Sequence, residues 1–154
     1  MLIRRMKIQM TSYKLLMIVA LGIIATKSVA QSEGNGQKTE LEGDWTIVSA
    51  KSGQDSFILE LAKGLTIQFS ENQMTFKGKK QTTKVQFKLD ASKEPKWFDL
   101  TDDKSNKAVK GIYVLDKGVL RLCVAGYPDQ KRPDKFEVSP GSDYALVILE
   151  KNKD

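Results

Sequence analysis

The chain contains no histidine and only one cysteine, Cys123, among its 154 residues. Without histidine, Ser-His-Asp and Cys-His catalysis, His-ligated zinc and an imidazole pH switch are all excluded. A single cysteine cannot form an internal disulfide, so the fold must rest on packing. Aromatic residues make up only 8% of the chain. At this length the sequence is expected to form one compact domain.

The first 30 residues carry five basic side chains and no acidic ones. An apolar run from Leu15 to Ala25 follows Lys14, and the segment ends in the small-x-small tripeptide 28–30. This pattern predicts a signal peptide at 1–30 and an exported protein, periplasmic or secreted. The alternative is a membrane anchor, but the 12 uncharged residues between Lys14 and Lys27 fall short of the ~20 that a spanning helix needs. We therefore expect no membrane span after cleavage.

The high overall charge belongs to this leader. The whole chain has 25 basic and 19 acidic residues, and removal of the five basic residues of 1–30 leaves a net charge of +1. A nucleic-acid-binding domain needs a clustered basic face, so we predict no nucleic-acid partner.

The remaining chain has a polar start followed by short alternating segments. Residues 31–40 lack periodicity and are expected to be a flexible tail before one domain at 41–151. Alternation of apolar and polar residues predicts strands. The expected strands cover 44–51, 65–70, 74–76, 84–89, 96–101, 109–115, 119–124 and 144–150. A short strand at 136–138 is a further candidate, and Asp55 or Ser56 can cap a short helix that runs to Lys63.

Eight short strands with hairpin-like spacing predict an all-β fold, either an antiparallel barrel or a sandwich. We favour the eight-stranded up-and-down barrel, with the short helix between its first two strands, because closure removes exposed strand edges. The connections at 71–73, 91–95 and 116–118 are short, whereas those at 52–64, 78–82, 102–108 and 125–143 are mostly long. One end of the barrel is thus expected to be tight, and the other to be the open end at which a binding function would lie.

The segment Gly43-Asp44-Trp45 places a G-x-W at the start of the first strand, as in lipocalin-like barrels. Together with KEPKWFDL at 93–100, GIYVLD at 111–116, LRLC at 120–123 and KRPDKF at 131–136, the chain resembles an uncharacterised family of exported bacterial lipocalin-like (calycin-type) domains that is abundant in planctomycetes. The resemblance implies a lipocalin-like barrel over about 41–150 and brings no catalytic residues. Lipocalins also pack a C-terminal arginine on the Trp. Here Lys151 is the nearest basic residue, and Arg121 is a candidate substitute.

The candidate ligand-binding residues are Arg132, Tyr113 and Trp97. Arg121 and Arg132 are the two arginines beyond residue 30, against 18 lysines, which suggests places where a planar guanidinium is needed. Arg132 lies in the loop expected over the open end, where it contacts an anionic ligand group or else ties the loop to the barrel. The two aromatic residues can line a cavity or simply pack.

The remaining candidates are structural. We expect Gly43, Trp45 and Arg121 to stabilise the fold, with Trp45 as a core plug at the tight end and Arg121 as a clamp. Cys123 is expected to be a buried, inert thiol, because no histidine can activate it. No calcium loop and no distinct carboxylate pair stand out, so we predict no metal, no cofactor and no enzymatic activity.

Two functions follow from a barrel of this size, which can hold one ligand or be filled by its own side chains. The expected inward set is strongly apolar and comprises Leu65, Ile67, Phe69, Phe76, Phe87, Leu89, Leu120 and Leu122. The first hypothesis is the binding of a small apolar or amphipathic ligand at the open end. The alternative is a non-catalytic interaction or structural module of the cell envelope with a filled interior.

Overall fold

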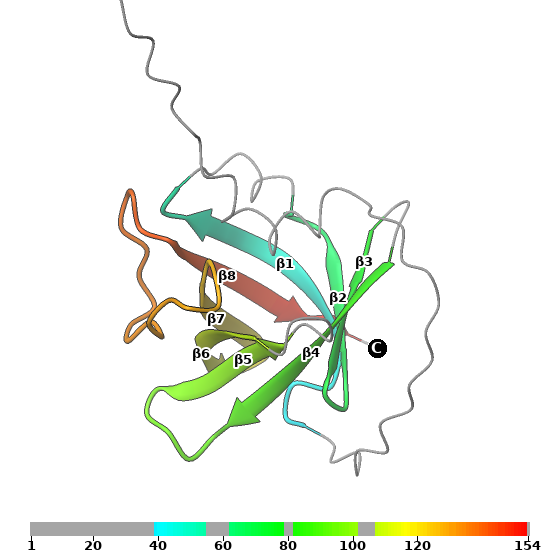
Figure 1. Ribbon diagram of the computed structural model, residues 1–154. Coiled ribbons are helices and arrows are strands. Elements are labelled where there is room, and N and C mark those ends of the chain that lie inside the picture. The colour runs from blue at the N-terminus through cyan, green and yellow to red at the C-terminus, as the bar shows by residue number, and fades with distance from the viewer. Residues whose placement is uncertain (1–38, 55–61, 79–81, 102–106, 154) are drawn as a thin grey trace, which may run out of the picture.

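The computed structural model describes residues 39–54, 62–78, 82–101 and 107–153. The strands in these ranges are Gly43–Ser52 (β1), Thr66–Ser70 (β2), Gln73–Lys77 (β3), Thr82–Asp90 (β4), Lys96–Thr101 (β5), Ala108–Asp116 (β6), Val119–Ala125 (β7) and Tyr144–Lys151 (β8). Each strand pairs antiparallel with the next, and β8 pairs with β1, which closes the sheet into an up-and-down barrel (Figure 1). The predicted barrel and all eight predicted strands are confirmed.

Two further predictions, a short strand at 136–138 and a short helix that ends at Lys63, are not confirmed. Residues 136–138 form no strand, because a closed barrel has no free edge with which an extra strand could pair. The predicted helix that ends at Lys63 falls mostly outside the described residues. Its last part, residues 62–64, forms a turn that ends at Gly64, whose φ is +80°.

The connections alternate in length as the sequence predicts. The tight end holds the links 71–72, 91–95 and 117–118, and the links 53–65, 78–81, 102–107 and 126–143, most of which are longer, lie at the other end. In the β6–β7 turn, Lys117 and Gly118 both have positive φ, at 47° and 80°. Positive φ at both central residues is what a two-residue type I′ hairpin turn requires.

Strand β1 contains a β-bulge at Val48. Its pairing with β8 shifts register between Ile47 and Ser49, which lie opposite Leu149 and Ile148. The extra residue bends the strand, and the Val48 side chain is 41% exposed on the outer face.

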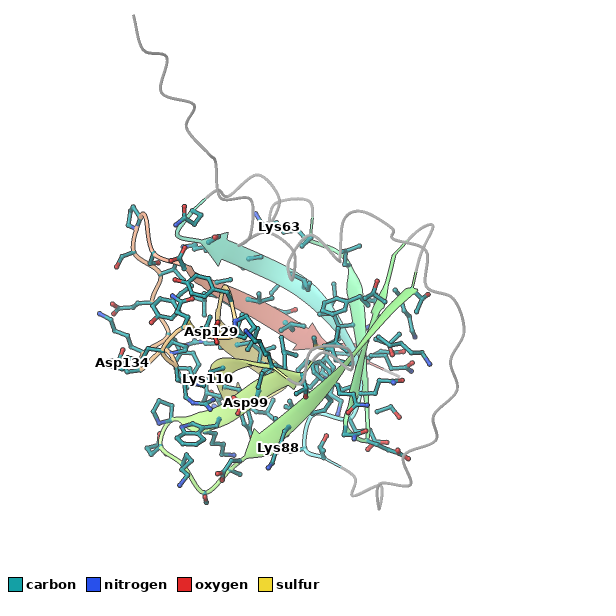
Figure 2. All side chains as sticks on the ribbon, viewed as in Figure 1. Lys63, Lys88, Asp99, Lys110, Asp129 and Asp134 are labelled. Atoms are coloured by element: carbon teal, nitrogen blue, oxygen red, sulfur yellow. The ribbon has the colours of Figure 1, made fainter. Side chains whose placement is uncertain are left out.

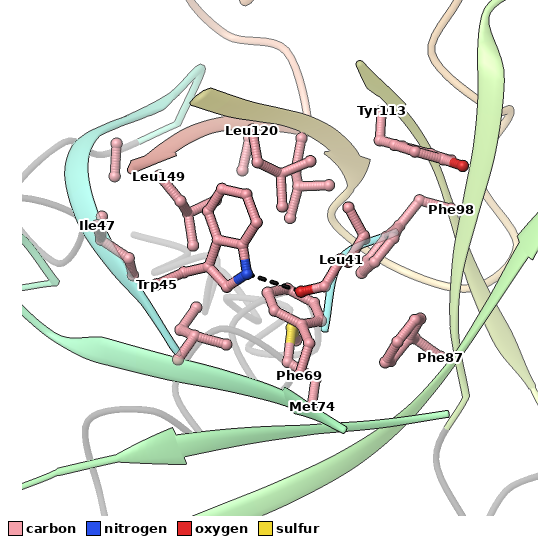
Figure 3. Packing of buried hydrophobic residues seen from close by; sticks show 14 residues of the cluster. Leu41, Trp45, Ile47, Phe69, Met74, Phe87, Phe98, Tyr113, Leu120 and Leu149 are labelled. Carbon is pink, nitrogen blue, oxygen red and sulfur yellow. Dashed lines mark hydrogen bonds between the residues drawn. The ribbon is translucent and has the colours of Figure 1, made fainter. Parts of the chain in front are cut away.

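A single cluster of buried apolar side chains packs inside the barrel (Figure 3). Trp45 is 0% exposed, and its Nε1 donates a hydrogen bond to the carbonyl of Leu41 at 2.7 Å. Phe69 meets the rings of Trp45, Phe87 and Phe98 edge-on, and the last two stack with centroids 5.6 Å apart. The predicted inward set is confirmed, because each of its members belongs to this core or packs against it.

Candidate functional site

The open end of the barrel carries apolar side chains that are only partly buried. They point inward, because each occupies the face that packs against the core, and they come from five different parts of the barrel wall. We call them the open-end ring: Leu65, Phe76, Leu100, Val124 and Val147. Each of these side chains is partly buried, so part of its surface stays in contact with water. The ring is therefore an inward-facing apolar surface that remains in contact with water.

A polar cluster lies at the same end of the barrel, beside the links that follow β1 and β7 and precede β8. The Asp143 carboxylate accepts a hydrogen bond from Gln54 Nε2 at 2.8 Å and another from the Tyr127 hydroxyl at 3.1 Å. The second bond raises the pKa of Tyr127, because it stabilises the protonated phenol beside a carboxylate. Backbone bonds from Gly53 N to Tyr144 O (3.2 Å) and from Gly141 N to Gly53 O (2.6 Å) hold the end of β1 against the start of β8.

Tyr113 points into the barrel, but it lies away from this ring. Its hydroxyl donates to Glu40 Oε1 at 2.6 Å, and Lys96 Nζ lies 3.0 Å from the same oxygen. Glu40 directly precedes Leu41, so these contacts fasten the start of the domain across the tight end. The Tyr113 bond, followed by the Lys96 contacts, lowers the pKa of Glu40. Burial, and then the Glu40 carboxylate, strongly raise the pKa of Tyr113.

Trp97 and Arg132 lie together on the outer wall. Phe98 and Leu100 point inward, so strand alternation directs Trp97 and Asp99 outward. The Arg132 guanidinium stacks 4.0 Å from the centre of the Trp97 ring and binds both carboxylate oxygens of Asp99, with Nη2 3.0 Å from Oδ2. Its Nη1 also donates to the carbonyl of Gly111 at 2.6 Å.

This placement departs from the sequence interpretation. The 126–143 connection starts at the open end, but at Arg132 it lies against the outside of β5 and β6. Of the two roles considered for Arg132, the contacts are those of a residue that ties the loop to the barrel. Asp99 itself lies between Lys88 on β4 and Lys110 on β6, directly opposite each in register (Figure 2).

Of the three structural candidates, Gly43 and Trp45 lie where a role in the fold requires them, whereas Arg121 does not contact the core. Gly43 has a φ of +122°, a conformation that favours glycine, and Trp45 is the buried plug that the sequence predicts. Lys151 Nζ lies 5.6 Å from the centre of the Trp45 ring. Arg121 is exposed on the outer face of β7, opposite Val114 and Ile148, and thus points away from Trp45.

Cys123 is a free, buried thiol. It faces outward on β7, but it is 0% exposed. Burial raises its pKa to about 11, so the thiol stays protonated near neutral pH and is a poor nucleophile.

Sequence reasoning missed the residues that hold the ends of the barrel. From the sequence, Glu40 belongs to the expected flexible tail, since a single acidic residue in a polar stretch gives no signal of a distant Tyr113. Asp143 and Tyr127 lie in or beside a loop without periodicity, so nothing in the sequence indicates that they meet.

No family model matches the sequence, and no curated protein or solved structure matches it. Among the residues that the structure describes, no group of three or more His, Cys, Asp or Glu side chains is arranged to hold a metal ion. Within the same ranges, no helix is long and apolar enough to cross a membrane.

Proposed function

We propose that this protein is a non-catalytic lipocalin-like barrel that takes up a small apolar or amphipathic molecule at its open end. The open-end ring is the observation that carries the proposal. Its side chains point inward and stay partly exposed, while the middle of the barrel is filled. A bound apolar group would remove ring surface from water, which is favourable by about 25 cal/mol per Å².

The aromatic core limits how deep such a ligand would enter. Phe69, Phe87 and Phe98 contact one another across the middle of the barrel. The ligand would therefore bind at a shallow depth, with a short apolar part against the ring. Its polar end would lie beside Asp143 and Tyr127. Because Asp143 is an acceptor and Arg132 is occupied by Asp99, the site favours a neutral or hydrogen-bond-donating polar end over an anionic one.

The proposal includes the resemblance to the lipocalin-like family and export from the cytoplasm. The lysine over the Trp45 ring and the G-x-W at the start of β1 support the first. The basic and apolar leader at 1–30 supports the second. We also propose that the β1–β2 connection carries the short helix, since the positive φ of Gly64 is typical of a helix stop.

Titration with the apolar fluorophore N-phenylnaphthylamine tests the binding proposal, followed by displacement with a long-chain alcohol. Val124→Thr places a hydroxyl on the ring with almost no change of shape. We expect it to weaken probe binding by about 3- to 10-fold, because a polar group then faces the apolar ligand. The matched control is Val114→Thr, the same change on the outer face of the neighbouring strand.

Two results would count against a ligand site at the open end. One is the absence of saturable probe binding by the folded protein, and the other is an equal effect of the two valine substitutions. Native mass spectrometry of the purified protein adds an independent readout, since a ligand that co-purifies would appear as a mass increment. If no ligand is found, the alternative hypothesis of a non-catalytic cell-envelope module accounts better for the protein. The packed aromatic core is consistent with the filled interior of such a module.

A further inference from the structure

Four side chains on the outer face of β7 and β8 form a small alternating pattern of charge and apolar surface. Val119 lies opposite Glu150, and Arg121 lies opposite Ile148. All four point outward, because Leu120 and Leu149 between them are buried in the core. We call this group the β7–β8 square. Its apolar members occupy one diagonal, and its oppositely charged members occupy the other.

Exposed apolar residues flank the square on both sides. Val114 on β6 is opposite Arg121 and is 37% exposed, and Val48 in the β1 bulge is 41% exposed. Large hydrophobic side chains with this exposure are few in the described part of the chain. The third is Trp97, which Arg132 covers on one side. The apolar surface left open on the barrel wall is therefore concentrated around the square.

In the described part of the chain, the charged members of the square lack side-chain partners. Among the described residues, neither Arg121 nor Glu150 takes part in an ion pair or a side-chain hydrogen bond. Arginine surrounded by apolar side chains is typical of protein interfaces, where it is enriched while other charged residues are depleted.

From this arrangement we infer that the β7–β8 square is the centre of a two-fold interface with a second copy of this chain. A two-fold axis lying in the contact plane midway between Arg121 and Glu150 places the arginine of each copy against the glutamate of the other. Val119 and Ile148 then lie near the axis and contact the second copy. The charge complementarity of one patch with itself is what an isologous interface needs.

The size of the patch sets the expected strength of the dimer. Four strands spaced ~4.8 Å apart span about 15 Å, and three residues along each strand span about 7 Å. The patch therefore covers on the order of 100 Å², well below the ~800 Å² per partner of a standard interface. The dimer is thus a weak one that forms and dissociates readily. It lies on the outer wall, away from the open-end ring, so its formation leaves the proposed ligand site accessible.

Sedimentation of the purified protein from micromolar to millimolar concentration tests the inference through a charge swap. Arg121→Glu and Glu150→Arg each place like charges together across the interface, so each is expected to raise the dimer dissociation constant at least ~10-fold. The double variant Arg121→Glu/Glu150→Arg restores opposite charges and is expected to return within about 3-fold of the original constant. Lys84→Glu, an exposed change of the same sign on β4, is the matched control and leaves the constant unchanged.

The thermal transition of each variant is measured alongside, so that loss of the dimer is not confused with loss of the fold. Val48→Thr is a second, uncharged probe of the same interface and is expected to weaken the dimer modestly. A protein that stays monomeric throughout the range would overturn the inference. So would a dimer that tolerates both single reversals, or one that the double variant fails to restore. A monomer that binds a different protein through this face would also contradict the assignment to a second copy.

Discussion

Replacement of Arg132 by lysine tests most directly how the long 126–143 connection is held. The guanidinium makes two contacts with Asp99, one with the Gly111 carbonyl and one with the face of Trp97. The ion pair is largely sheltered from solvent, with the Arg132 and Asp99 side chains 16% and 26% exposed. Lysine keeps the positive charge, but it offers no planar group to bridge a carboxylate and a carbonyl while stacking on an indole.

The expected cost can be worked out from these contacts. A hydrogen bond to a charged group contributes ~1.5–3 kcal/mol net, and an exposed cation–π contact adds ~0.5–1 kcal/mol. Lysine still forms an ion pair with Asp99 and retains part of both. We therefore expect Arg132→Lys to lower the free energy of unfolding by about 1–2 kcal/mol and Arg132→Ala by about 3 kcal/mol. For a domain of this size, 1 kcal/mol corresponds to roughly 3–5 °C in Tm.

Urea denaturation of the two variants provides the assay, with Lys131→Ala as the control at the neighbouring position. A double-mutant cycle with Asp99→Asn isolates the pair, and we expect Arg132→Lys to cost much less once the carboxylate is gone. The refuting result is an unchanged denaturation midpoint in Arg132→Lys. If the same variant also bound an anionic probe more weakly, Arg132 would have to be returned to the ligand-binding residues.

Three further predictions concern other parts of the chain. Trp45→Ala is expected to destabilise the domain by ~3–5 kcal/mol, as loss of a large core aromatic does, and an unchanged urea midpoint would contradict its role as a plug. The pKa of Glu40 is lowered from 4.5 chiefly by Tyr113, so this carboxylate stabilises the fold above that value and ceases to do so as the pH falls through its lowered pKa. Tyr113→Phe should therefore cost stability at neutral pH, and the difference from the unsubstituted protein should shrink on acidification, as followed by melts across the acid range. If 1–30 is a signal peptide, intact-mass analysis of the exported protein will place its N-terminus at Gln31, whereas retention of the leader would exclude cleavage after Ala30.

Strand alternation made most of the fold predictable. In Leu65, Ile67 and Phe69 every second residue is apolar, and only one face of such a strand can point into a core. The lengths of the connections then assigned the two ends. Both signals are local, which is why they can be read from a single sequence. Side-chain partners such as Glu40 and Tyr113 are brought together only when the barrel closes, and no local pattern records that event.

The candidate site was harder to predict, because the path of a long loop depends on contacts with residues that are distant in the sequence. The loop-length argument correctly starts the 126–143 connection at the open end. It cannot show that the chain then turns back along the outside of the barrel. That turn moved Arg132 from the expected opening to the outer wall. Of the two roles considered for Trp97, lining a cavity or packing, its place on the outer wall against Arg132 is that of a packing residue, because its strand neighbour Phe98 faces inward.

The return of this loop also accounts for the unusual outer face of the last strands. Ile112 and Cys123 face outward by alternation, yet both are 0% exposed, and Pro133 beside the anchoring Arg132 is buried as well. The connection therefore acts as a short second layer over the outward-facing Ile112 and Cys123, which explains why these two positions are apolar although they lie on the outer face. The same apolar character continues past the loop to Val114 and Ile148, where no segment of the described chain covers it. A face that the protein covers with its own loop at one end and leaves open at the other is where we expect a second copy to bind.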